Sequence, residues 1–273
     1  MLMRKRKQNW FYGISTHTGS VRQSNEDNVY INTIRDRKGN EMLVTVVADG
    51  MGGYDAGDVA SETIVTMIDK WFRKKVPPML ALPYPFTKIA SEIDKLLQKA
   101  NATLISEGEK LGNKMGTTAS ILFLYKNQYF ITHIGDSRIY QISENPEQEQ
   151  EENYQLVQLT EDHSWVMDQV KKNLLTEEEA EKHPKKNLLL QCLGITEDFS
   201  PFMTEGSFSK QDTFFLCSDG FYNIYPKQAL LEGFRALQGS DQTFQSFADC
   251  LVKDADQRGA TDNITVSIVT PKY

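Results

Sequence analysis

The most constraining feature of the sequence is a nearly unbroken apolar run from Met42 to Ala48 (MLVTVVA). A strand that is apolar on both faces has to be covered on both sides, so this run predicts a strand inside a layered structure. Two earlier segments also predict strands: residues 10–17 are rich in aromatic and β-branched types, and residues 28–35 alternate in character. The N-terminal part of the chain is therefore expected to build a sheet.

Helices are expected after these strands. Residues 56–74 and 86–109 place apolar side chains at three-to-four spacing, and residues 76–85, which hold four prolines, predict a break between them. Further strands are predicted over 117–125, 128–134, 138–142, 154–159, 214–218 and 264–269, and a further helix over 241–256. This order lacks the regular β-α-β-α alternation of a parallel sheet. It predicts an α+β sandwich with antiparallel strands, in a single domain over residues 1–273.

Two segments are strongly polar. Residues 144–153 (ENPEQEQEEN) are acidic and glutamine-rich, which is typical of a solvated loop. Residues 160–195 are polar and helical in pattern, with Thr176 as a helix cap before three glutamates.

Charge and cysteine content exclude several classes of protein. The net charge of −7 argues against nucleic acid as the main partner. The three cysteines, Cys192, Cys217 and Cys250, are too widely spaced for a disulfide framework or a thiolate zinc site, which favours a reducing compartment. No apolar segment suits a signal peptide or a membrane span. We therefore expect a cytoplasmic monomer with no membrane partner.

Acidic residues stand at the ends of at least four predicted apolar strands. They are Asp49-Gly50, Gly135-Asp136 and Asp219-Gly220, which follow strands, and Asn25-Glu26-Asp27 and Asp262-Asn263, which precede strands. Each of these alone is more typical of a turn. If the strands share one sandwich, however, their ends could bring several carboxylates together.

Such a cluster would be costly without a counter-ion. Two like charges about 4 Å apart repel by about 4 kcal/mol at an effective dielectric constant of 20, so four or five of them would exceed the ~5–15 kcal/mol stability of a typical domain. Divalent cations would offset this repulsion, and oxygen ligands select Mg²⁺ or Mn²⁺. Two such ions bridged by an aspartate would lower the pKa of a shared water from 15.7 towards about 7, and the resulting hydroxide could attack a phosphate ester.

Arg22 is a candidate to hold the phosphate, because a guanidinium matches phosphate oxygens with two parallel hydrogen bonds. It stands four residues before Glu26. A surface arginine in a structural salt bridge is an equally good interpretation of its position.

Six motifs, taken in order, resemble those of the metal-dependent protein phosphatases of the PPM (type 2C) family. They are Arg22-x-Ser24-Asn25-Glu26-Asp27, residues 47–53 (VADGMGG), Gly116-Thr117-Thr118, Gly135-Asp136-Ser137-Arg138-x-Tyr140, Ser218-Asp219-Gly220 and residues 261–265 (TDNIT). The resemblance extends from about residue 12 to residue 270. It implies a central β-sandwich flanked by helices on both sides, hydrolysis of phosphoserine and phosphothreonine in proteins, and often a cognate Ser/Thr kinase as partner.

The resemblance also implies a role for each acidic residue, with Mn²⁺ or Mg²⁺ as the cofactor. Asp49 would bridge two core ions, and Asp219 and Asp262 would bind the first of them. The second ion would be held by Glu26 and the Gly50 carbonyl, and a third ion, as in bacterial members, by Asp136 with Asp219. Asp27 would lie just outside the ligands, and Arg22 would hold the phosphate. Ser137 and Arg138 are interpreted as structural residues.

One position departs from the eukaryotic pattern. Met51 stands where those relatives carry a histidine proposed as general acid, and a thioether cannot donate a proton. This departure resembles bacterial members. Residues 160–195 match the flap region of the family, and their polarity suits substrate recognition. Two other hypotheses remain open: a catalytically silent phosphatase-like module that senses a ligand or partner, and a different metal-dependent phosphoesterase such as a nuclease.

Overall fold

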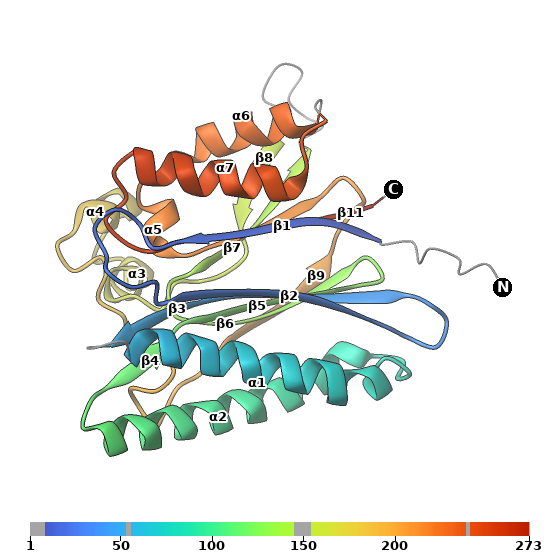
Figure 1. Ribbon diagram of the computed structural model, residues 1–273, viewed down its shortest axis with the longest axis horizontal. Coiled ribbons are helices and arrows are strands. Elements are labelled where there is room, and N and C mark those ends of the chain that lie inside the picture. The colour runs from blue at the N-terminus through green and yellow to red at the C-terminus, as the bar shows by residue number, and fades with distance from the viewer. Residues whose placement is uncertain (1–8, 53–55, 145–153, 239–240, 273) are drawn as a thin grey trace.

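Two antiparallel sheets stacked face to face form the centre of the molecule (Figure 1). The computed structural model describes residues 9–52, 56–144, 154–238 and 241–272. The first sheet has the order β1 (Trp10–His17), β11 (Ile264–Pro271), β10 (Thr213–Cys217), β7 (Arg138–Glu144) and β8 (Tyr154–Gln158). The second has the order β2 (Asp27–Arg35), β3 (Glu41–Gly52), β5 (Ala119–Tyr125), β6 (Gln128–Ile134) and β9 (Phe202–Ser207), and β4 (Met115–Thr117) pairs with β3.

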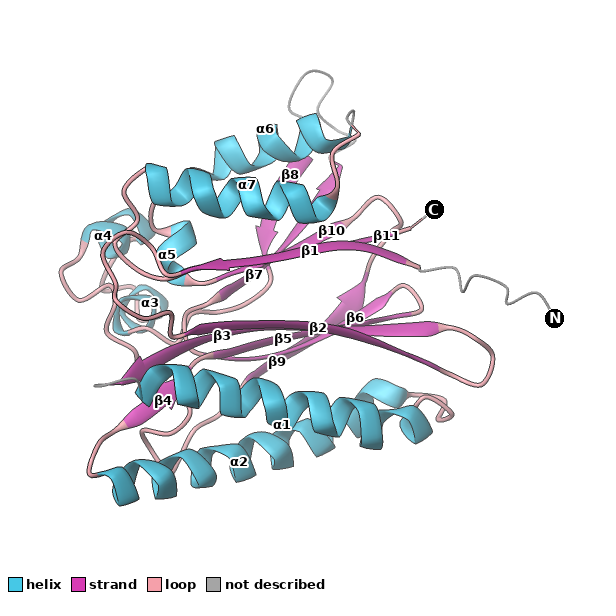
Figure 2. Ribbon diagram, viewed as in Figure 1, coloured by secondary structure: helices cyan, strands magenta, loops and turns pink. Residues whose placement is uncertain are grey.

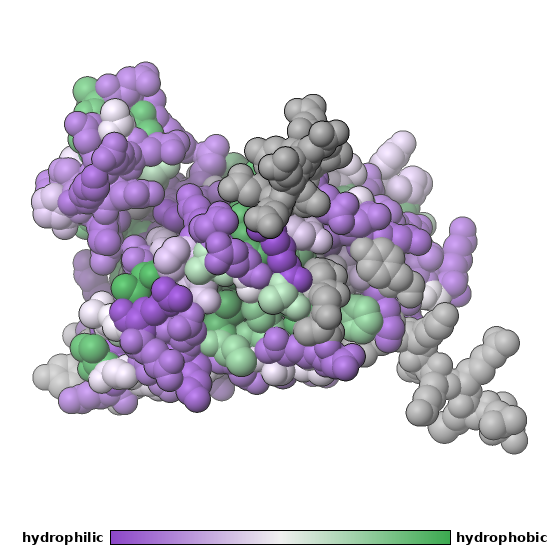
Figure 3. Space-filling view, turned by 90° about the horizontal axis from the view of Figure 1, so that it is seen from above, coloured by the Kyte–Doolittle hydropathy of each residue, from purple (hydrophilic) through white to green (hydrophobic). Residues whose placement is uncertain are grey.

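Helices cover the outer face of each sheet (Figure 2). Helices α1 (Ala56–Met79) and α2 (Pro85–Leu111) pack on the second sheet, and α6 (Lys227–Gln238) and α7 (Phe244–Gln257) pack on the first. This arrangement confirms the predicted α+β sandwich with helices on both sides. Seen from the side of α6 and α7, the surface is mostly hydrophilic, with hydrophobic side chains in small groups (Figure 3). None of the described helices is both long and apolar enough to cross a membrane.

Strand β3 contains the apolar run from Met42 to Ala48, and its surroundings explain why that run is apolar on both faces. Its side chains alternate between two cores: Val44 and Val46 pack with α1 and α2, whereas Leu43 and Val47 face the first sheet. Between the sheets, the hydroxyl groups of Thr45 and Ser267 form a buried hydrogen bond of 2.8 Å. Apolar residues on both faces are therefore what a strand between a helical layer and a second sheet requires.

The structure corrects one helix boundary. Helix α1 was expected to end before the prolines, but it continues through Pro77 and Pro78 to Met79. These prolines fall in the last turn, and Val76 and Met79 beside them are buried in the core, so packing holds the helical turn despite the missing N–H groups. The polar segment 160–195 contains only two short helices, α3 (Trp165–Lys171) and α4 (Glu177–Lys182), and Thr176 caps α4 as predicted.

Four elements were not predicted: β4, β9, α6 and the four-residue helix α5 (Asp219–Tyr222). Of these, α5 matters for function, because it begins directly after β10 at one of the acidic motifs. The acidic loop 144–153 lies, apart from Glu144, outside the described residues. Helices α3, α4 and α5 lie together at one end of the sandwich, opposite the end where the chain begins and finishes (Figure 1).

Candidate active site

The acidic residues of β2 and β3 meet across the second sheet. Asp27 is the first residue of β2 and lies opposite Asp49 in the antiparallel register. Asp27 is buried and accepts a hydrogen bond of 2.7 Å from the hydroxyl of Ser218, which follows β10 of the other sheet. Asp27 thus ties the two sheets together at the end where the strands carry their acidic residues.

Asp49 is fixed through its backbone. Its N–H donates to Thr118 Oγ1 over 2.9 Å, and the Thr118 N–H donates to the Asp49 carbonyl over 2.8 Å. The Thr118 hydroxyl also lies 2.8 Å from the hydroxyl of Ser137. Thr118 and Ser137, which belong to two of the sequence motifs, therefore fix the backbone of β3 at Asp49. This contact agrees with the interpretation of Ser137 as a structural residue.

The carboxylates share one electrostatic environment. Burial raises the pKa of Asp49 well above its usual value, and the negative charges of Asp27, Asp219, Asp136 and Asp262 raise it further. Burial and neighbouring aspartates likewise raise the pKa of Asp27 to about 7 and that of Asp219 to about 6. Residues from five separate segments of the chain are thus close enough to repel one another.

Asp136 belongs to the same group, because burial and the charge of Asp219 raise its pKa well above the usual value. Within the described residues, no three His, Cys, Asp or Glu side chains already form a ready-made metal-binding set. The fit to a divalent ion rests instead on donor chemistry: the clustered groups are carboxylates, their burial disfavours the charged form, and hard cations favour oxygen ligands.

Glu26 and Gly50 lie beside this cluster. The Gly50 N–H donates to the Glu26 carbonyl over 3.1 Å, and the Glu26 N–H donates to Asn263 Oδ1 over 2.9 Å. A Cβ atom at Gly50 would lie 2.1 Å from the Gly57 carbonyl oxygen, so only glycine fits there. Burial raises the pKa of the Glu26 carboxyl, although a hydrogen bond from the Gly57 backbone opposes this effect.

Arg22 reaches the cluster from the loop between β1 and β2. Its guanidinium lies 2.6 Å from Asp262 Oδ2, and its side chain is 48% exposed. The charges of Asp262, Glu26 and Asp49 all raise the pKa of Arg22. Arg22 is therefore both a salt-bridge partner of Asp262 and an accessible cation at the acidic cluster.

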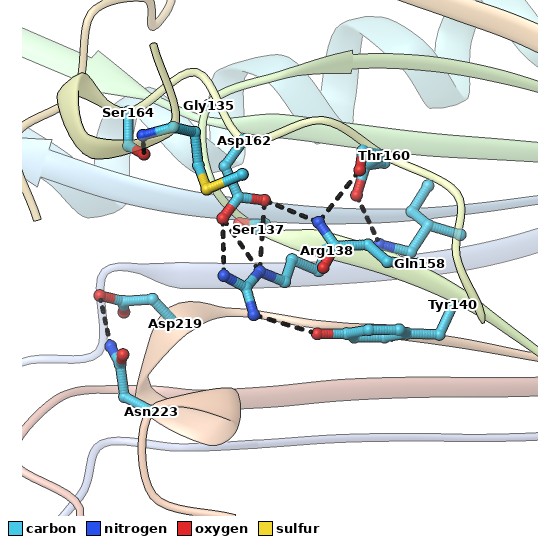
Figure 4. A network of polar contacts seen from close by, with 12 residues as sticks. Gly135, Ser137, Arg138, Tyr140, Gln158, Thr160, Asp162, Ser164, Asp219 and Asn223 are labelled. Atoms are coloured by element: carbon cyan, nitrogen blue, oxygen red, sulfur yellow. Dashed lines mark hydrogen bonds and ion pairs between the residues drawn. The ribbon is translucent and has the colours of Figure 1, made fainter. Parts of the chain in front are cut away.

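Arg138 forms a local network with Asp162 and Tyr140 (Figure 4). Its guanidinium donates to both carboxylate oxygens of Asp162, the shortest contact being 2.7 Å, and lies 3.8 Å from the ring centre of Tyr222. The pairing agrees with the structural interpretation of Arg138. Since Asp162 belongs to segment 160–195, the pair also fastens the start of that segment to β7.

Two neighbouring histidines, the buried His133 and the half-buried His163, were missed by the sequence interpretation, which treated all histidines as scattered. His133 donates from Nε2 to the Gly135 carbonyl over 3.0 Å, and the Gly135 N–H donates to His163 Nδ1 over 3.3 Å. Burial and the neighbouring His163 lower the pKa of His133 to about 3, so its ring is neutral at pH 7. Gly135 has φ of +110°, and the two rings hold this turn immediately before Asp136. The sequence offered one indication of this contact, namely that His133 stands two residues before Gly135.

Comparison with known proteins assigns the family. A family model of protein phosphatase 2C matches residues 16–263. The serine/threonine phosphatase Stp of Listeria monocytogenes is 35% identical over 257 residues, which cover 93% of this chain and 93% of that protein. The solved structure of the S. agalactiae serine/threonine phosphatase is similar with a TM-score of 0.79 at 28% identity, covering 96% of this chain and 100% of that chain.

A further solved structure, the catalytic domain of the serine/threonine phosphatase PstP in complex with 2 manganese ions, has the same fold. Its TM-score is 0.75 at 24% identity, and the match covers 97% of this chain and 99% of that chain. The family model spans most of the sequence, and the relatives are covered almost end to end. The resemblance inferred from the six motifs is confirmed, and this chain belongs to the protein phosphatase 2C family of serine/threonine phosphatases.

Proposed function

We propose that this chain hydrolyses phosphoserine and phosphothreonine in proteins with two divalent ions, Mn²⁺ or Mg²⁺, at the clustered carboxylates. Family membership supports phosphatase activity that depends on metal. The observation that carries the site is the strand register that places Asp27 opposite Asp49, where burial and the charges of four aspartates raise the pKa of Asp49. Manganese in the PstP structure supports the same choice of ion.

Each acidic residue receives the role that the motifs imply. Asp49 would bridge the two ions, and the neighbouring aspartates that raise its pKa are consistent with a central position. Asp219 and Asp262 would hold the first ion. Glu26 and the Gly50 carbonyl would hold the second, at a position where only glycine fits. Asp136 with Asp219 would hold a third ion, and Asp27 would stand outside the ligands, opposite Asp49 on the facing strand.

Bound ions supply an activated water at neutral pH and neutralise the charge of the phosphate. The protein contributes the fixed positions of the carboxylates, each of which lies in a strand or within two residues of a strand end. Met51, on β3 opposite Gly116 of β4, cannot donate a proton to the leaving oxygen. We therefore assign that proton to a water at the site. A cognate kinase, a monomeric state and a cytoplasmic location stay predictions.

Arg22 holds the phosphate in this proposal, and its replacement tests the role. We expect Arg22→Ala to lower kcat/KM for p-nitrophenyl phosphate by about 10- to 100-fold, since a hydrogen bond to a charged group contributes about 1.5–3 kcal/mol. The loss should appear mainly as a raised KM. Arg22→Lys keeps the charge but loses the paired hydrogen bonds and should recover only part of the activity.

Steady-state kinetics and thermal unfolding of both variants separate the two interpretations of Arg22. An exposed ion pair contributes only about 0–1 kcal/mol to stability, so neither variant should unfold much earlier. An unchanged KM in Arg22→Ala would leave Arg22 as a structural partner of Asp262.

The function itself is tested by hydrolysis of p-nitrophenyl phosphate and of a phosphothreonine peptide. Both activities should require Mn²⁺ or Mg²⁺, and chelation should abolish them reversibly. Full activity in excess chelator would contradict the proposal. Metal binding without any turnover would favour the silent sensing module, and cleavage of DNA or RNA with the same ions would favour the nuclease.

A further inference from the structure

A turn in the flap, residues 183–188, is anchored to the start of the flap. The Lys186 N–H donates to the His183 carbonyl over 3.0 Å, and the Leu188 N–H donates to the Lys185 carbonyl over 3.0 Å. The Trp165 N–H then donates to the Leu188 carbonyl over 2.8 Å. The start of the flap is in turn tied to the residue before Asp136, because the His163 N–H donates to the Gly135 carbonyl over 2.7 Å. The turn therefore has a defined position near the acidic cluster.

The lysines of the flap fall into two groups. Lys171, Lys172 and Lys182 each form an ion pair, with Glu161, Asp168 and Glu178 respectively. Lys185 and Lys186 are exposed, and within the described part of the chain neither has a carboxylate within 4.0 Å. Lys185 instead lies with its ammonium 4.7 Å from the ring centre of Trp165.

Lys186 belongs to this anchored turn, and the residues after the turn pair with the start of the flap: the Leu190 N–H donates to the His163 carbonyl over 2.7 Å. Because the flap is held next to Gly135 in this way, Lys186 and Arg22 are two exposed cations on segments beside the acidic cluster, one on the flap and one on the β1–β2 loop. Arg22 is paired with Asp262, whereas Lys186 has no such partner among the described residues.

We propose that Lys186, with Lys185 beside it, binds acidic side chains that flank the phosphorylated residue, so that the enzyme prefers acidic phosphosites. The inference rests on the proposed function, because it assumes that a phosphorylated side chain occupies the cluster. An extended peptide advances about 3.3 Å per residue, so residues two or three positions away pass the rim rather than the centre. There an unpaired ammonium attracts a carboxylate of the substrate.

Four glutamates of α4 stand just before this turn, and two of them, Glu177 and Glu181, form no ion pair within the described residues. In the first turns of α4, Glu179 completes the capping box with Thr176 and Glu178 pairs with Lys182. The aspartates of the cluster repel an acidic peptide only while they lack counter-ions, and the proposed cations neutralise them.

The experiment compares two phosphothreonine peptides that differ only at flanking positions, glutamate in one and glutamine in the other. Wild-type enzyme should show a kcat/KM about three- to tenfold higher for the glutamate peptide at low salt, and the ratio should fall as salt rises. The double variant Lys185→Gln, Lys186→Gln should bring the ratio close to one. A ratio cancels any general change in turnover that the variant causes.

Lys182→Gln is the matched control, because it removes the same charge from the same segment at a lysine that is already paired. It should keep the wild-type ratio. A wild-type ratio of one, or an unchanged ratio in the double variant, would overturn the inference while hydrolysis of p-nitrophenyl phosphate still upholds the proposed function. If wild-type enzyme hydrolyses neither substrate with metal present, the proposed function and the inference both fail.

Discussion

Replacing Asp49 by asparagine is expected to lower kcat/KM for p-nitrophenyl phosphate by about 10³-fold or more at saturating Mn²⁺. Partners that only support a metal ligand already contribute about 10- to 100-fold, and the proposed bridging residue should contribute more. Asparagine has almost the same shape, and its side chain removes one of the five crowded charges. The metal-free variant should therefore be at least as stable as the wild type.

Kinetics, calorimetric titration with Mn²⁺ and thermal unfolding in chelator together check this prediction. Asp198→Asn is a suitable control, because Asp198 is an exposed aspartate outside the cluster, and its replacement should leave all three measurements unchanged. Retained activity in Asp49→Asn would remove Asp49 from the centre of the mechanism. Lost activity with a strongly destabilised fold would indicate a structural role instead.

Much of this site could be predicted because its residues are encoded at strand ends. The apolar run before Asp49 predicted a strand covered on both faces, and β3 is covered on both faces. Where a strand ends in the sequence fixes where its last residue lies in the sheet. The acidic motifs beside the predicted strands therefore indicated that several carboxylates could meet at one end of the sandwich. Local sequence was sufficient here because burial and strand boundaries depend mainly on each segment's own side chains.

Other features depend on contacts between distant segments and could not be predicted. Pro77 and Pro78 signal a helix end, but the buried neighbours of these residues keep α1 helical to Met79. The contact of His133 and His163 around Gly135 joins β6 to the flap across 30 positions of sequence, counted from 133 to 163. The spacing of Arg22 left its two interpretations open. The structure shows the ion pair with Asp262 and a side chain that is 48% exposed, while the phosphate contact stays a prediction.

The free energy of unfolding of the metal-free protein should depend on pH, because the clustered carboxylates have raised pKa values. Asp27 has its pKa raised from 3.8 to about 7 in the folded protein, so the folded state retains a proton that the unfolded state has lost between these pH values. The stabilising contribution is therefore fully present below pH ~4 and is lost as the pH rises towards 7. At 1.36 kcal/mol per pH unit, the loss is on the order of 4 kcal/mol.

His133 contributes with the opposite sign. Its pKa is lowered from 6.5 to about 3, so its contribution is present above pH ~6.5 and is lost as the pH falls. The total stability curve of the wild type therefore mixes the two effects. The difference between Asp27→Asn and the wild type removes the contribution of His133, which is the same in both proteins, and leaves that of Asp27 and the aspartates it interacts with.

We expect this difference, measured by urea unfolding in chelator, to grow in favour of Asp27→Asn as the pH rises from 4.5 to 7.5. Saturating Mn²⁺ should reverse the order at pH 7.5, because the negative charge of Asp27 beside the ligands strengthens ion binding and ion binding stabilises only the folded state. A difference that does not change with pH would mean that neither burial nor the neighbouring aspartates raise the pKa of Asp27. The repulsion between the clustered carboxylates destabilises the metal-free fold, and the same concentration of negative charge binds the ions. The pH range in which the cluster loses its protons should therefore be the range in which added metal begins to stabilise the protein.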